Sequence, residues 1–200
     1  MQLQDIQPAI SHIQNHPVVT DLRSLTYLST YPEILALVDE DEIQASQLKQ
    51  LALMVYGWMP RVLRIDRAHF QSALQVANAA KLATPEIFEN IAIQHIANCL
   101  HSMVGASKLL HFINPNVFPI WDRKIQAFRG LPNGNNDMSN IENYFAYVRD
   151  AHSIVEENGF NEFYAQYNSV HENRLKQCKV DFYQVGQLRA IEASAFELAA

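Results

Sequence analysis

Apolar residues recur at helical spacing along most of this chain, and no useful stretch alternates apolar and polar residues as a strand does. The first segment has Leu3, Ile6, Ile10 and Ile13 on one helical face, and His16-Pro17 ends it. Similar stripes, separated by Pro, Gly and Asn, predict helices over 3–15, 20–28, 32–38, 41–56, 68–82, 84–103, 138–157, 160–167 and 181–198. The sequence therefore predicts an all-α fold.

Length and composition limit how these helices assemble. The chain has 200 residues, 48% of them hydrophobic, which is enough to bury the core of one compact domain over 1–200. Two small helical lobes around a cleft are the alternative. The clearest long loop is 130–139, which is rich in Pro, Gly, Asn and Asp, as turns are. We find no internal repeat.

Several classes of protein do not fit the sequence. There is no run of about 18 apolar residues, so no membrane span or membrane partner is predicted. The first residues lack the pattern of a secretion signal, which indicates a cytoplasmic protein. Cys99 and Cys178 are expected to be reduced thiols. His95 and Cys99 share a helical face but His101 does not, and no carboxylate completes a set, so neither a metal nor a cofactor is predicted.

Charge is distributed unevenly along the chain. The net charge of -6 argues against indiscriminate binding to nucleic acid, and the acids concentrate at 39–42 and 156–157. Two stretches are basic instead, one with Arg61, Arg64 and Arg67, the other with Lys108, Arg123, Lys124 and Arg129. An acidic protein with basic patches suits an anionic partner that is met at one face only.

The densest chemistry lies between Val104 and Gly130. Asp122 stands between Trp121 and Arg123, where a Pro-rich connection becomes a helix. An aspartate at this point can cap the helix by accepting backbone N–H bonds. It can also supply a fixed negative charge for a positive charge that develops in a reaction, and the two roles are compatible.

Lys108 and His111 lie three positions apart on one helical face of this segment. A lysine in such an apolar stretch can have a lowered pKa and act as a nucleophile. The alternatives are a lysine that snorkels at the edge of the core or contacts phosphate. His111 is either a proton carrier that contacts the substrate or a structural histidine with its hydrogen bonds satisfied.

Two further sets of residues are candidates for contacting a ligand. The aromatic residues Tyr56, Trp58 and Trp121 could stack on a flat ligand such as a nucleobase, or they fill the core. The amides of Asn90, Asn114 and Asn116 could read an amide or sugar edge, or they are ordinary turn residues.

The segment from Met103 to Lys108, followed after an apolar stretch by Phe118-Pro119-Ile120-Trp121-Asp122, resembles the active-site segment of the helix-hairpin-helix DNA glycosylases. This resemblance implies a helix-hairpin-helix-like element near 100–125. It also implies an enzyme that flips a nucleotide out of DNA and cleaves its N-glycosidic bond, leaving an abasic site. Within that superfamily the chain looks most like the small helical glycosylases of bacterial anti-phage defence, which remove glucosylated hydroxymethylcytosine from phage DNA.

The resemblance also implies roles for residues. Asp122 matches the aspartate that stabilises the sugar cation. Gly105 matches a glycine of the hairpin turn whose N–H groups grip phosphate, and Ser107 is expected at the DNA backbone with it. With Gly105 aligned to the second hairpin glycine, Ser107 rather than Lys108 takes the lysine position, as in monofunctional members without lyase activity. The leucine-proline-glycine that usually precedes this glycine is absent. The basic residues that would hold the flanking phosphates are Arg61, Arg64, Arg123, Lys124 and Arg129.

Two other classes of function remain open from the sequence. In a non-catalytic nucleic-acid-binding module, Asp122 would be only a cap and the basic patches would supply the affinity. A helical interaction protein would show no salt-dependent affinity for DNA. DNA is the predicted partner, and no obligate protein partner is evident in the sequence.

Overall fold

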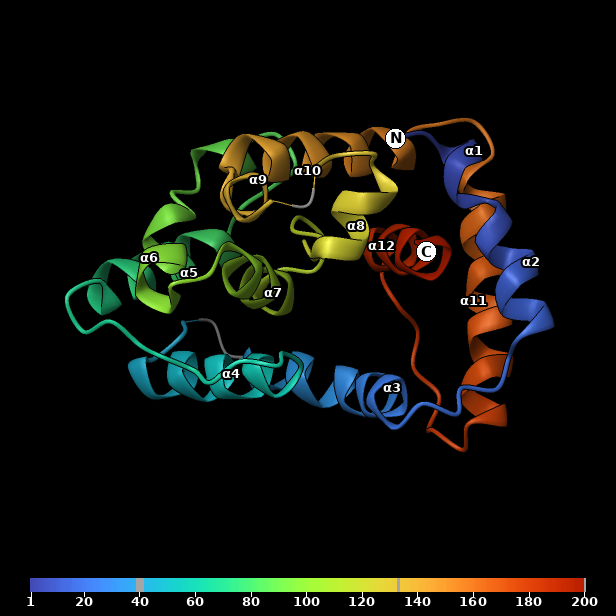
Figure 1. Ribbon diagram of the computed structural model, residues 1–200, viewed down its shortest axis with the longest axis horizontal. Coiled ribbons are helices and arrows are strands. Elements are labelled where there is room, and N and C mark those ends of the chain that lie inside the picture. Colours follow the sequence, from blue (N-terminus) through green and yellow to red (C-terminus); the bar gives the residue numbers. More distant parts are fainter. Residues whose placement is uncertain (39–41, 133, 200) are drawn as a thin grey trace.

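The computed structural model describes residues 1–38, 42–132 and 134–199, and these residues form helices joined by short connections (Figure 1). No strand occurs in these ranges, so the all-α prediction is confirmed. Positions 39–41 of the acidic stretch 39–42, and Asn133 of the loop predicted over 130–139, lie outside the described residues. The helices are α1 (Leu3–Ile6), α2 (Pro8–Asn15), α3 (Leu22–Leu35), η1 (Ala36–Val38), α4 (Ala45–Gly57), α5 (Phe70–Lys81), η2 (Phe88–Asn90), α6 (Gln94–Leu100), α7 (Met103–Ile113), α8 (Arg123–Phe128), α9 (Asn135–Ser139), α10 (Ile141–Val155), α11 (Phe160–Gln177) and α12 (Gln187–Leu198).

Helix α7 lies at the centre of the fold. All its residues except Val104 are buried, because α3, α4, α5, α6 and α9 pack around it. Helices α8 and α12 lie beside it in the middle of the molecule, with α10 along one side and α2 and α11 at one end (Figure 1). A single hydrophobic cluster runs through these helices, from Leu3 to Ala195. The segment with the candidate chemistry is therefore surrounded by the rest of the chain.

Prolines alter two of the predicted helices near the N-terminus. The predicted helix over 3–15 is divided into α1 and α2 because Pro8, at the first position of α2, has no N–H for the hydrogen bond that would continue α1. The two predicted helices over 20–28 and 32–38 are instead one helix, α3, which contains Pro32 and is followed by η1. Asp21 begins α3, its carboxylate accepting hydrogen bonds from the N–H groups of Arg23 and Ser24.

The prediction of one long helix over 84–103 is wrong. The chain forms a turn, then the short η2, and only then α6. Phe88, Ile91 and Ile93 are all buried, and a continuous helix could not turn all three toward the same core. Helix α6 ends at His101, which has a left-handed backbone (φ 48°).

The C-terminal helices also differ from their predicted bounds. Asn140 caps α10 and separates it from α9, so the predicted helix over 138–157 is two helices. Helix α11 continues well beyond position 167, whereas α12 begins only at Gln187. Gly159 has φ 90°, the left-handed conformation expected from its place after Asn158.

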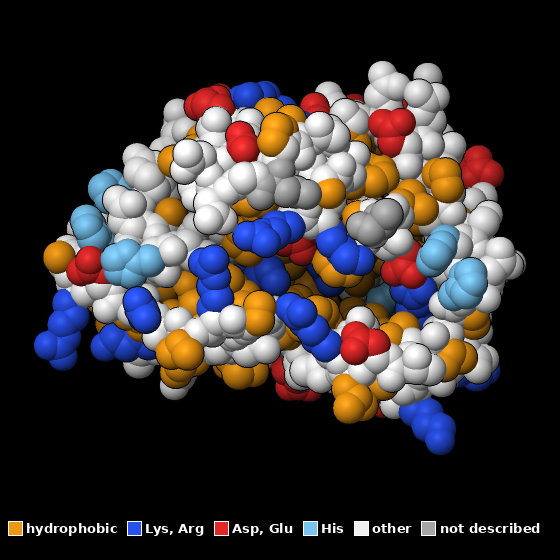
Figure 2. Space-filling view, in the orientation of Figure 1, with side chains coloured by type: hydrophobic (Ala, Val, Ile, Leu, Met, Phe, Trp, Pro, Cys, Tyr) orange, Lys and Arg blue, Asp and Glu red, His pale blue; other side chains and the backbone are white. Residues whose placement is uncertain are grey.

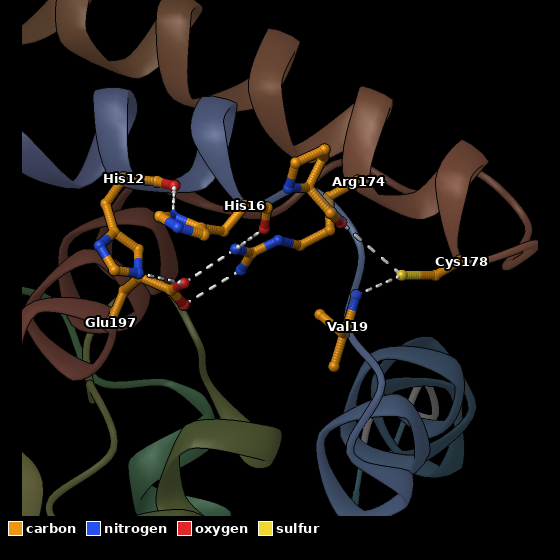
Figure 3. Close-up of polar contacts among 7 residues, drawn as sticks. His12, His16, Val19, Arg174, Cys178 and Glu197 are labelled. Carbon is orange, nitrogen blue, oxygen red and sulfur yellow. Dashed lines mark hydrogen bonds and ion pairs between the residues drawn. The ribbon is translucent and has the colours of Figure 1, made fainter.

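An ion-pair cluster, which we call the terminal clamp, joins α2 and the last helix, α12, to α11 (Figure 3). The guanidinium of Arg174 donates hydrogen bonds to both carboxylate oxygens of Glu197, at 2.8 and 3.0 Å, and to the carbonyl of His16 at 3.1 Å. His12 Nε2 lies 3.5 Å from the same carboxylate. Bidentate pairing of this kind is the strongest form of protein ion pair. It connects α2, α11 and α12.

The terminal clamp predicts a pH dependence of stability. Burial raises the pKa of Glu197, but the hydrogen bonds and charge of Arg174 outweigh it and hold the pKa below the ordinary value of 4.5. Stability from this carboxylate is therefore present above pH 4.5 and lost as the pH falls through the lowered pKa. We expect the difference in unfolding free energy between the unsubstituted protein and Glu197→Gln to shrink during acid titration followed by urea denaturation. A difference that stays constant down to pH 3 would contradict this role.

Candidate active site

Asp122 caps helix α8, as the sequence predicts. Its Oδ1 accepts a hydrogen bond from the N–H of Ile125 at 3.0 Å, and its backbone is extended. The residue is half-buried, whereas Arg123 and Lys124 after it are exposed. No other hydrogen bond to this carboxylate occurs among the described residues, so its second oxygen is available for another partner.

The Pro-rich connection before Asp122 is held through its backbone carbonyls. His152 contacts the carbonyl of Val117 at 3.0 Å, His111 that of Phe118 at 2.8 Å, and Tyr144 that of Pro119 at 3.2 Å. These bonds satisfy backbone groups that a buried non-helical segment would otherwise leave unpaired. Helices α7, α9 and α10 therefore hold the connection that leads to Asp122, since Ser107 and Met138 bond to Trp121 as well.

Ser107 holds Trp121 and thereby brings Lys108 close to Asp122. The hydroxyl oxygen of Ser107 accepts a hydrogen bond from the N–H of Trp121 at 3.1 Å and lies 3.2 Å from its carbonyl oxygen. Lys108 and Asp122 are the next residues after each of these two. The buried Ser107 is thus a structural link between α7 and the connection, and the prediction that it contacts DNA phosphate is wrong.

Lys108 is buried, with only 8% of its surface exposed. Burial lowers its pKa, and the nearby carboxylates of Asp122 and Glu192 offset part of this effect. Its ammonium forms no hydrogen bond or ion pair with the described residues. The direction of this shift agrees with the lowered pKa considered from the apolar sequence context, and Lys108 interacts electrostatically with Asp122.

His111 is a structural residue rather than a proton carrier. Because the carbonyl of Phe118 can only accept, Nδ1 of His111 carries the proton, and Nε2 accepts a hydrogen bond from the hydroxyl of Tyr31 at 2.9 Å. Burial lowers the pKa of this histidine to about 3, so the ring is neutral at physiological pH. The prediction that it contacts substrate is wrong, because the side chain is completely buried.

The three candidate stacking residues belong to the core. Trp121 is fully buried and donates from Nε1 to the carbonyl of Met138, and Trp58 donates to the hydroxyl of Thr30. Tyr56 donates to the carbonyl of Leu100 at 2.8 Å. Each of these rings packs in the hydrophobic core, and its polar atom already has a protein partner. The prediction of base stacking is therefore wrong, and the core alternative is the correct one.

The three asparagines do not converge on Asp122. Asn114 donates to the carbonyls of Ala80 and Ala83, so it caps the end of α5 and is a structural residue. Asn90 is exposed in η2. Asn116 is exposed and lines a separate groove of about 750 Å³, to which α10 contributes His152. Sequence spacing therefore did not predict which amides would lie near the carboxylate.

Gly105 lies inside the first turn of α7, not in a hairpin turn. Its N–H donates to the hydroxyl of Ser102, which caps the helix, so it is not available to phosphate. A Cβ at this position would lie 3.1 Å from the hydroxyl of Tyr56, so glycine allows α4 to pack closely against α7. Helices α6 and α7 are joined by His101 and Ser102 alone. The predicted glycine turn and phosphate grip are wrong.

The basic residues fall into two groups. Arg61, Arg64, Arg123 and Lys124 are exposed and can meet an anionic partner. Arg129 is half-buried and forms an ion pair with Asp150, so the prediction that it holds a phosphate is wrong. Figure 2 shows Lys and Arg side chains gathered around a hollow over α7 and α8, with acidic and hydrophobic side chains inside it.

Arg189 and Glu192 of α12 are not among the site residues predicted from the sequence. The two are ion-paired beside the site, and Glu192 interacts electrostatically with Asp122 and Lys108. They occupy inward positions between the buried residues Leu188 and Ala195. Charges within an apolar helical stripe were the signal that could have revealed them.

No group of three His, Cys, Asp or Glu side chains within the described ranges could hold a metal ion. Likewise, none of the described helices has the length and apolar character needed to span a membrane. Comparison of the chain with protein-family models, with curated proteins and with solved structures found no match in any of the three. We therefore infer function from the site itself.

Proposed function

We propose that this protein is a DNA N-glycosylase that removes a flipped base and leaves an abasic site. A modified cytosine of phage DNA is the substrate favoured by the resemblance of residues 103–122, and anti-phage defence is the corresponding role. The observation that carries the proposal is Asp122, a half-buried carboxylate with one oxygen that has no hydrogen bond among the described residues, which interacts electrostatically with the buried Lys108.

Departure of a base from deoxyribose leaves positive charge on the sugar. A fixed carboxylate near the anomeric carbon stabilises that charge, as in glycoside hydrolysis. Asp122 suits this task because the N–H of Ile125 holds one oxygen and leaves the other for the sugar or for the attacking water. The cleaved N-glycosidic bond gives its electron pair to the base, and water supplies the new C–O bond.

The departing base gains negative charge and needs a proton. Lys108 can supply it, since a lysine with a lowered pKa releases its proton more readily than an ordinary lysine. In this proposal the amine acts as a general acid and does not bond to the sugar, and the proton that the attacking water loses restores the ammonium of Lys108. Ser107, which takes the lysine position in the resemblance, is fully buried and bonded to Trp121.

DNA would be held by the exposed cations. Arg61 and Arg64 follow α4, and Arg123 and Lys124 begin α8, so contacts from two parts of the fold would reach the phosphates around one flipped nucleotide. Flipping costs a few kcal/mol, and polar contacts in the hollow rather than Tyr56, Trp58 or Trp121 would offset this cost.

The test of the proposed function is release of a base. The protein is incubated with oligonucleotides that contain normal, uracil, oxidised, hydroxymethylated or glucosylated cytosine bases, and abasic sites are scored by alkali cleavage. We expect abasic sites with at least one modified base. No abasic site with any of these substrates, in single-stranded or duplex form, would overturn the proposed function.

The same assay without alkali tests the monofunctional assignment. We expect strands to remain intact until alkali is added, because the proposed role of Lys108 includes no bond to the sugar. Lys108→Met should lower the rate of abasic-site formation by roughly 10²- to 10⁴-fold, the usual contribution of a positioned acid. Alkali-independent breaks that disappear in this variant, together with borohydride trapping, would show lyase chemistry instead.

A further inference from the structure

The α12 pair, Arg189 and Glu192, is unusually deeply buried. The side chains are 18% and 3% exposed, and Nη1 of Arg189 is ion-paired with Oε2 of Glu192. The guanidinium also lies over the ring of Tyr31, 4.8 Å from its centroid. A buried ion pair contributes little net stability compared with apolar residues, because desolvation offsets the attraction. Its presence in the middle of the fold calls for another explanation.

Four ionisable side chains interact electrostatically with one another here, and among the described residues they form one ion pair. Asp122 and Lys108 are the other two, and both interact electrostatically with Glu192. Among the described residues, neither Lys108 nor Asp122 is ion-paired with any member of the set. Polar side chains that converge and keep hydrogen-bonding capacity are typical of ligand sites.

Two nearby buried side chains also lack partners. Tyr147, whose hydroxyl has no hydrogen-bond partner in the described part of the chain, interacts electrostatically with Glu192 and Asp122. Nε2 of His171 is likewise without a partner there, and Arg189 is among the causes of the lowered pKa of this ring, after burial. Buried polar groups are normally hydrogen-bonded, so each of these two side chains retains capacity for a further hydrogen bond.

We propose that the α12 pair selects the flipped base, accepting cytosine-type bases and rejecting uracil-type bases. The proposal rests on the function proposed above and deepens it. It assigns base selection to residues of α12, which lies outside the segment 103–122 that resembles the glycosylases.

The chemistry follows from donors and acceptors on the base. A cytosine-type base has an amine at C4 and acceptors at N3 and O2. The carboxylate of Glu192 can accept from the amine, while the unpaired guanidinium nitrogens of Arg189 can donate to N3 or O2. A uracil-type base has an oxygen at C4, which would face the carboxylate without a proton between them. A site built on hydrogen bonds rejects such an analogue because its buried polar groups stay unpaired.

The test measures binding, so that it does not depend on turnover. Asp122→Asn protein is titrated with oligonucleotides that contain one 5-hydroxymethylcytosine or one 5-hydroxymethyluracil, in single-stranded and duplex form. These bases differ in the C4 substituent and in the proton at N3. We expect the cytosine-type oligonucleotide to bind roughly 10- to 100-fold more tightly, as for a well-formed base contact. Adding Glu192→Gln should remove the preference, because an amide can donate to the C4 oxygen.

The matched control is Glu197→Gln, which also removes the charge of an α12 carboxylate paired with an arginine, but in the terminal clamp. It should lower stability and leave the base preference unchanged. If Glu192→Gln fails to fold by circular dichroism, Arg189→Lys takes its place, and a reduced preference is expected. The selection proposal is overturned if Asp122→Asn protein binds both oligonucleotides equally or binds neither. It is also overturned if the preference is unchanged by Glu192→Gln or Arg189→Lys. Abasic-site formation by unsubstituted protein is scored separately, so base selection and the proposed function can fail independently.

Discussion

Asp122→Asn is expected to lower the rate of abasic-site formation by about 10²- to 10³-fold, the usual cost of removing one electrostatic stabiliser of a transition state. Asparagine caps helices as well as aspartate does, so the bond from the N–H of Ile125 is kept and the unfolding free energy should change by less than about 0.5 kcal/mol. The measurement is single-turnover kinetics on the best modified substrate, with chemical denaturation in parallel.

A suitable control for Asp122→Asn is Asp21→Asn. Asp21 caps α3 and accepts hydrogen bonds from the N–H groups of Arg23 and Ser24, but it lies outside the site. We expect full activity from this variant. If Asp122→Asn also keeps full activity, Asp122 is only a cap. If the unsubstituted protein and its variants bind DNA but none of them forms abasic sites, the protein is a non-catalytic nucleic-acid-binding module.

Arg174→Met is expected to reduce the free energy of unfolding by about 3 to 5 kcal/mol, the range for breaking a buried ion pair from one side. Methionine retains much of the apolar stem of arginine but removes three hydrogen bonds, two to Glu197 and one to the carbonyl of His16 (Figure 3). Glu197 then remains partly buried without its cation. Urea denaturation followed by circular dichroism measures the loss.

The comparison for Arg174→Met is Arg149→Met on α10. Arg149 pairs with Glu89 at the surface, where the two side chains are 47% and 51% exposed, so solvent screens the attraction. Its removal should cost about 1 kcal/mol or less. Similar losses in the two variants would mean that burial does not distinguish the two pairs, and that the terminal clamp is not a special feature of the fold.

Helical periodicity was enough to predict the fold class, but not where helices stop. Pro8 divides one predicted helix, while Pro32 is accommodated within α3. The difference depends on what packs around each proline, which no local pattern records. Similarly, the sequence pattern predicts that Phe88, Ile91 and Ile93 belong to one helix. In the structure all three side chains are buried in the core, and the chain is not one continuous helix there.

The candidate site was predictable only where the chemistry is local. The cap formed by Asp122 follows from its position before a helix, and the low pKa of Lys108 follows from its apolar neighbours. The α12 pair lies about 70 residues further along the chain, so only tertiary packing brings it to Asp122. The aromatic residues illustrate the converse, since a tryptophan beside a catalytic candidate can still face the core, as Trp121 does.

The neutral ring of His111 has a consequence for how the site meets its ligand. It joins the Phe118 carbonyl, just before Asp122, to the hydroxyl of Tyr31, and the ring of Tyr31 lies under Arg189. Each of these side chains is fixed by its own contacts, so the geometry around Asp122 is established when the protein folds. Under the proposed function, little ordering entropy then remains to be lost on association, and the conformational work falls on the nucleic acid.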